Sequence, residues 1–176
     1  MPEFYAKGAV VLCALLLAWP ASAQAPRRVG AAGVTVALPP GWHATRPDQA
    51  SVTNPLTRIV VASAAIHPDL TSACQTQVAA YAFPKTAVAI VVVERTVPIG
   101  GMKIGSGPRR PRRFTAATLP IQRAPAIECF DGPGGSAQFA EHGRSFAAYV
   151  LLGRKAPARL ADRARAVLDT LHVASR

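Results

Sequence analysis

The chain has 176 residues, half of them apolar, and a formal net charge of +11. This length suits a single domain, and the apolar content excludes a globally disordered protein. Sixteen of its twenty basic residues are arginine, so the charge indicates either an anionic partner or the coding bias of a GC-rich genome.

The first 23 residues have the pattern of a cleavable export signal. A short polar opening that ends at Lys7 precedes an apolar run over residues 8–19, which Pro20 ends. Such a run is shorter than the ~20 residues of a membrane-spanning helix, and small residues then lead to Ala23. We expect cleavage after Ala23, with an uncleaved anchor or a buried helix as alternatives. A flexible segment over residues 24–32 and one domain over residues 33–176 would then form a secreted or extracytoplasmic protein.

Apolar periodicity predicts a mixed fold. The expected strands are residues 33–38, 58–64, 88–94, 126–130, 136–141 and 144–152. The run over 88–94 is so uniformly apolar that we expect it at the centre of the sheet, covered on both faces. Spacings of three and four predict helices over residues 69–83 and from Pro157 onward. This order predicts an α+β fold with an antiparallel sheet of about six strands packed against two helices.

Two turns are predicted among the last three strands. His142 and Gly143 form a two-residue loop, and residues 131–135 form a glycine-rich turn. Gly132, Gly134 and Gly135 resemble a phosphate-binding loop, but such a loop opens a helix, whereas a strand is expected after residue 135. We therefore interpret these glycines as a hairpin turn.

Cys74 and Cys129 are the cysteines that remain after signal cleavage. In an oxidising compartment they are expected to form one disulfide bond, and two buried free thiols are the alternative. His142 follows Cys129 at a distance typical of a zinc finger, but the second Cys and second His of such a site are missing. We expect no metal and no cofactor.

The one long irregular segment, residues 98–113, is rich in glycine, proline and arginine. Its four clustered arginines are Arg109, Arg110, Arg112 and Arg113. Guanidinium groups bind phosphate or carboxylate in a bidentate manner, so this is a possible anion-binding loop. A solvated basic loop is the alternative. The run lacks the interleaved aromatic residues on which bases stack, which argues against nucleic acid.

Catalytic motifs are absent from the sequence. It contains neither HExxH nor Gly-x-Ser-x-Gly, and no histidine lies four residues from another. Glu94 and Glu128 are the acids that we considered for a cleft, and partnership with an arginine is the alternative for each. The sequence thus offers no catalytic residue.

Three segments carry a resemblance to a known family. Residues 34–42 (VTVALPPGW) run from a strand into a Pro-Gly-Trp turn, residues 58–64 form the next strand, and the closing helix ends at residues 168–171. Over residues 30–173 the chain resembles the PsbP-like domains, and also the poorly characterised exported domains of GC-rich bacteria. The resemblance implies an α/β sandwich that serves in binding or as an accessory subunit, generally without catalytic residues. The cysteine pair and the arginine-rich loop depart from that pattern.

These observations favour an exported, non-enzymatic binding or accessory domain of the cell envelope or the medium. Its partner would be a protein or an envelope component. A small exported hydrolase with an unrecognised site is one alternative, and a basic protein that binds an anionic polymer is the other.

Overall fold

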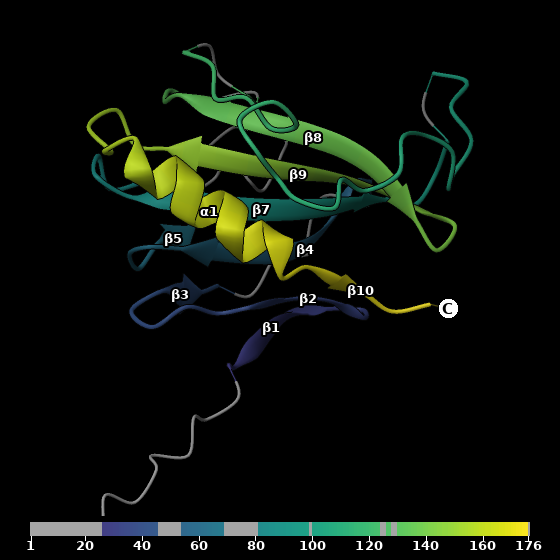
Figure 1. Ribbon diagram of the computed structural model, residues 1–176, viewed down its shortest axis with the longest axis horizontal. Helices are drawn as coiled ribbons and strands as arrows, with labels where there is room; N and C mark the ends of the chain where they lie inside the picture. The colour runs from purple at the N-terminus through teal and green to yellow at the C-terminus, as the bar shows by residue number, and fades with distance from the viewer. Residues whose placement is uncertain are drawn as a thin grey trace, which may run out of the picture.

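The computed structural model describes residues 26–45, 54–68, 81–98, 100–123, 126–127 and 130–175. Within these ranges the chain forms ten strands and one helix, with the strands in three antiparallel sheets (Figure 1). The strands and the helix are β1 (Arg28–Ala31), β2 (Val34–Ala37), β3 (His43–Ala44), β4 (Leu56–Ala62), β5 (His67–Pro68), β6 (Tyr81–Ala82), β7 (Val88–Arg95), β8 (Gly134–Glu141), β9 (Arg144–Leu152), α1 (Arg159–Asp169) and β10 (His172–Val173). The α+β class predicted from the sequence is therefore confirmed.

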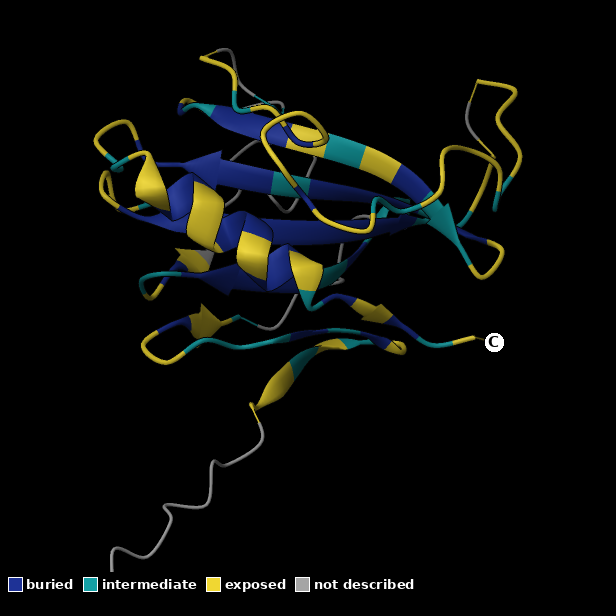
Figure 2. Cartoon of the chain, in the orientation of Figure 1, coloured by how far each residue is buried: buried dark blue, intermediate teal, exposed yellow. Residues whose placement is uncertain are grey.

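The largest sheet has the strand order β3-β4-β7-β9-β8. β7 lies at its centre and pairs with β4 on one side and β9 on the other, with Val91 opposite Val60 and Tyr149. Every residue of β7 from Val88 to Glu94 is buried (Figure 2). The uniformly apolar run thus occupies the central position that was predicted for it.

Each face of this sheet has its own apolar core. Ile90 and Val92 belong to a core that includes residues of α1 and β2. Val91 and Val93, which alternate with them along β7, belong to a second core that includes Phe130. Because successive side chains of a strand point to opposite faces, one continuous apolar run serves both cores.

α1 packs on the first face of the sheet through an apolar stripe (Figure 1). Leu160, Ala164 and Leu168 are buried at helical spacing, as the sequence predicts for the closing helix. Arg165 is also buried and donates hydrogen bonds from Nε and Nη2 to the carbonyl of Leu119, at 3.2 and 3.0 Å. These bonds tie the segment after the arginine-rich loop to the helix.

A separate three-stranded sheet, β1-β2-β10, lies beside α1. The expected strand over 33–38 is found as β2, whose Val34 and Val36 point into the core. Residues 28–31, within the segment expected to be flexible, instead form β1 and pair with β2. Ala32 and Gly33 join these two strands with positive φ angles of 51° and 74°. In β1 the part-buried Val29 and Ala31 alternate with the exposed Arg28 and Gly30. Four residues are too few for this alternation to identify a strand from the sequence, and the pairing with β2 defines it.

The number of strands is corrected, because the main sheet has five strands and not six. Among the described residues one helix, α1, is found. Most of the first predicted helix, residues 69–80, lies outside the described residues, so its prediction stays untested there, while Tyr81 and Ala82 at its predicted end form β6 instead. No helix in the described ranges has the length and apolar character needed to cross a membrane.

The predicted strand over 126–130 does not form at its described residues, 126–127 and 130. The edge of β8 is met instead by Gln122, whose amide and carbonyl exchange hydrogen bonds of 2.8 and 3.0 Å with Gly134. Gly134 and Gly135 belong to β8, so the predicted glycine hairpin turn is wrong as well. A Cβ on Gly135 would lie 2.2 Å from the carbonyl oxygen of Pro120. Glycine is required at position 135 because another backbone passes so close to it.

Candidate functional site

The arginine-rich loop lies along the outer edge of β8. The amide of Ala140 donates a 2.7 Å hydrogen bond to the carbonyl of Pro108, and Arg109 forms an isolated bridge with Ala140. These contacts place the loop next to the turn between β8 and β9, which consists of His142 and Gly143. The two residues have φ angles of 49° and 70°, so the two-residue turn predicted from the sequence is confirmed.

Arg110 fixes the loop in place. Its Nε lies 2.7 Å from Oε2 of Glu141, and its Nη2 donates a 3.1 Å hydrogen bond to Oε1 of the same carboxylate. Its Nη1 donates a 2.8 Å hydrogen bond to the carbonyl of Leu171. One guanidinium therefore joins the loop, the end of β8 and the segment after α1. This arginine has a structural role and neutralises Glu141.

A cleft of about 580 Å³ opens between the loop, the β8–β9 turn and the end of α1. Its lining residues are Arg109, Arg110, Pro111, Arg112, Ala140, Glu141, His142 and Asp169. Arg109 and Arg112 are exposed, and neither forms an ion pair within the described part of the chain. Arg113 is exposed too but does not line the cleft. The four arginines thus divide into one structural residue, two cleft residues and one that lies apart.

The charge of the cleft is positive. Three arginines face two carboxylates, which leaves a formal excess of one positive charge with His142 neutral. Asp169 accepts a 2.7 Å hydrogen bond from the amide of Phe114, and Glu141 is paired with Arg110. Arg109 and Arg112 are therefore the groups that can receive an anion, and guanidinium groups suit phosphate and carboxylate oxygens.

Glu94 lies apart from this cleft, at the end of β7, and is 1% exposed. Arg144 donates to its two carboxylate oxygens from Nε and Nη2, both at 2.8 Å, and Arg58 donates from Nε at 2.7 Å. Burial alone would raise the pKa of Glu94, but the hydrogen bonds and charges of Arg144 and Arg58 outweigh burial and lower this pKa to about 2. Glu94 is therefore an ionised partner of two arginines, which was the alternative considered for it.

Cys74, Cys129 and Glu128 lie outside the described residues, so their predicted roles stay predictions. The four histidines are spread over β3, β5, the β8–β9 turn and β10, and among them His142 lines the cleft. In the part of the chain that the structure describes, no group of three or more His, Cys, Asp or Glu side chains is placed to hold a metal ion.

Sequence reasoning identified the arginines but not the carboxylates of the cleft. Glu141 and Asp169 lie 28 residues apart in the chain, and only the pairing of β8 with β9 and the docking of α1 bring them beside the loop. A useful signal was present, because Glu141 directly precedes the predicted two-residue turn. The register that sets the turn beside Arg110 was not available from the sequence.

Comparison with protein-family models, curated proteins and solved structures finds no match to this chain. The resemblance to PsbP-like domains therefore stays a prediction from the sequence.

Proposed function

We propose that this protein is an exported, non-enzymatic binding domain that holds the phosphate or carboxylate groups of an anionic ligand in the basic cleft. The observation that carries the proposal is the state of Arg109 and Arg112. Both are exposed on the wall of a cleft whose shape is held by the ion pair of Arg110 with Glu141, and neither is neutralised within the described residues. Two exposed guanidinium groups on one wall can contact the same anion, and their planar donors suit phosphate and carboxylate oxygens.

Export and an accessory role are supported by the sequence. The pattern of residues 1–23 is that of a cleavable signal, and the similarity to PsbP-like domains agrees with a binding function. The hydrolase alternative required Glu94, Glu128 or a histidine to converge with a serine or an aspartate. The enclosure of Glu94 by Arg58 and Arg144 weighs against a catalytic role for that carboxylate.

The test is the retention of the protein on inorganic polyphosphate as a function of salt. Replacing Arg109 and Arg112 with Gln should weaken binding at low salt at least about tenfold, and should lower the slope of log K against log salt by roughly two, one for each lost contact. Arg110 is kept, because its loss would release the loop.

Arg159→Gln with Arg163→Gln is the matched control. Both arginines are exposed in the first turns of α1, and neither lines the cleft. The control has the same net charge as the cleft variant, because each variant loses two arginines. Equal losses in the two double variants would mean that net charge alone drives retention and would overturn the proposed site. Unchanged binding of the cleft variant would overturn it too.

Asp169→Asn provides a gain of function at the same site. The amide oxygen can still accept the hydrogen bond from the amide of Phe114, while a negative charge leaves the cleft. Retention on polyphosphate should therefore rise about two- to fivefold, since a like charge close to the ligand is removed.

A further inference from the structure

The loop that follows β7 exposes apolar side chains. Val97 and Met102 are each 49% exposed, and they are the large apolar residues with high exposure among those described. Val97 directly precedes the irregular segment over residues 98–113, and Met102 lies within it, before the arginine-rich run. Both side chains line the same small hollow, so they are neighbours on the surface.

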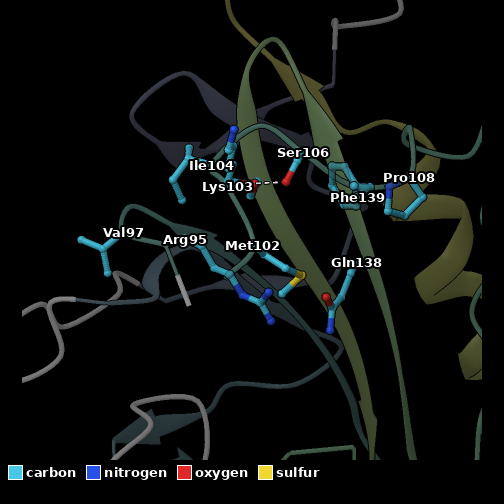
Figure 3. A pocket seen from close by; sticks show the side chains of 11 residues that line it. Arg95, Val97, Met102, Lys103, Ile104, Ser106, Pro108, Gln138 and Phe139 are labelled. Atoms are coloured by element: carbon cyan, nitrogen blue, oxygen red, sulfur yellow. Dashed lines mark hydrogen bonds between the residues drawn. The ribbon is translucent and has the colours of Figure 1, made fainter. Parts of the chain in front are cut away.

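Two cations lie beside this pair. Arg95 and Lys103 line a small hollow together with Val97 and Met102 (Figure 3). Neither cation forms an ion pair within the described ranges. We call Val97, Met102, Arg95 and Lys103 the apolar tip.

The loop that carries the tip is held against the β8–β9 hairpin at Gly105. The amide of Gly105 donates a 2.8 Å hydrogen bond to Oγ of Ser145. Gly105 also lies so close to Gly143 that an added Cβ would come within 2.7 Å of its carbonyl oxygen. The basic cleft is built on the same hairpin, and the two loops lie at the same end of the molecule (Figure 1).

We propose that this end of the molecule docks on the surface of an anionic lipid bilayer, with Val97 and Met102 entering the interface and the surrounding cations contacting headgroup phosphates. The inference rests on the proposed function for its cationic part, Arg109 and Arg112, and adds the apolar tip. A soluble polyanion has no apolar surface that Val97 and Met102 could contact. A bilayer interface offers an apolar layer directly below a layer of phosphate, which matches both parts.

Co-sedimentation with lipid vesicles tests the inference. The exported protein should bind vesicles of phosphatidylcholine with about 30% phosphatidylglycerol more tightly than vesicles of phosphatidylcholine alone. Val97→Ser with Met102→Ser should weaken binding to the anionic vesicles about tenfold, roughly the effect of losing two buried methylene groups. Val97→Leu with Met102→Leu, which keeps the tip apolar, should bind as well as the wild type.

Retention on polyphosphate separates this inference from the proposed function. Both tip variants should be retained like the wild type, whereas the variant of Arg109 and Arg112 should lose retention. If the serine variant binds the anionic vesicles as tightly as the wild type does, the proposed docking on a lipid surface is overturned. The proposed anion site in the cleft is not affected by that result. If the variant of Arg109 and Arg112 is retained on polyphosphate like the wild type, the proposed anion site in the cleft is overturned instead.

A tryptophan at position 102, in the variant Met102→Trp, reports how deeply the tip enters the bilayer. Its fluorescence should shift to shorter wavelength on addition of anionic vesicles and should be quenched by brominated lipid. The wild-type protein gives the baseline, because Trp42 is 6% exposed. An unchanged spectrum on vesicles that do bind the protein would place the tip outside the bilayer and overturn the inference.

Discussion

Two arginine side chains from neighbouring strands enclose the buried carboxylate of Glu94. Arg58 comes from β4, at the position where the register of β4 with β7 shifts, and Arg144 opens β9. Arg144 also donates to the carbonyl of Ala32 at 3.2 Å and lies 5.1 Å from the ring centre of Phe146. The group thus links the central strand, both of its neighbours and the β1–β2 turn.

Glu94→Gln should lower the free energy of unfolding by about 3 kcal/mol, because it leaves the buried guanidinium of Arg144 and the part-buried guanidinium of Arg58 without a charged acceptor. Urea unfolding measures the loss. The control is Asp131→Asn, since Asp131 pairs with Arg154 at a site where the two side chains are 84% and 62% exposed. That change should cost at most about 1 kcal/mol. Similar small losses in both variants would contradict a stabilising role for the buried group.

The same residue gives the protein a defined acid sensitivity. The pKa of Glu94 is about 2 in the folded protein, against an ordinary 4.5. A folded pKa below the unfolded one means that the contribution is complete above pH 4.5 and is lost as the pH falls toward 2. The difference in unfolding free energy between the wild type and Glu94→Gln should therefore shrink over that range. A difference that does not change with pH would mean that the carboxylate is not held ionised.

At the scale of elements, the β8–β9 hairpin positions the cleft. Its turn requires a positive φ of 70° at Gly143, and no heavy atom lies within 4 Å of the position that a Cβ would take there. Gly143→Ala should therefore cost about 1 kcal/mol of unfolding free energy through backbone conformation alone. Gly143→Asn should cost less, because asparagine tolerates this conformation. Equal losses measured by urea unfolding would point to steric crowding instead.

The longer elements could be predicted from the sequence, and the shorter ones could not. β2, β4, β8, β9 and α1 bury apolar side chains at strand or helix spacing, and β7 is a continuous apolar run, so each has a local signal. β3, β5, β6 and β10 have two residues each, too few to show a period, and they form because a partner strand lies alongside. Residues 126–130 carried a strand pattern, but Gln122 meets the edge of β8 instead.

The cleft was predictable only in its charge. Four arginines in an irregular segment were visible in the sequence, but which of them forms an ion pair depends on tertiary contacts. Arg110 pairs with Glu141 because the loop lies along β8, and Arg109 and Arg112 are left to bind an anion. A sequence pattern holds no information about which member of a cluster meets a carboxylate from a distant strand.

At the scale of the whole molecule, the proposed export makes a prediction about covalent structure. Protein purified without reductant from the medium or the periplasm should have the mass of a chain that begins at Gln24, and it should show no free thiol. Removal of residues 1–23 takes away one Glu and one Lys, so the formal charge stays at +11. Replacing Cys74 and Cys129 with Ser should lower the free energy of unfolding by about 4 kcal/mol.

A full-length mass in the membrane fraction would contradict the signal, and reactive thiols would contradict the disulfide bond. The two results are independent of each other, and neither bears on the basic cleft.

The burial of β7 on both faces has a consequence for the protein outside its folded state. Val88 to Val93 form an uncharged, β-branched segment of the kind that stacks with copies of itself when exposed, and in the folded molecule each of these residues is at most 3% exposed. The two layers that cover it therefore act against self-association between chains. Substitutions that loosen either layer are expected to lower the yield of soluble protein.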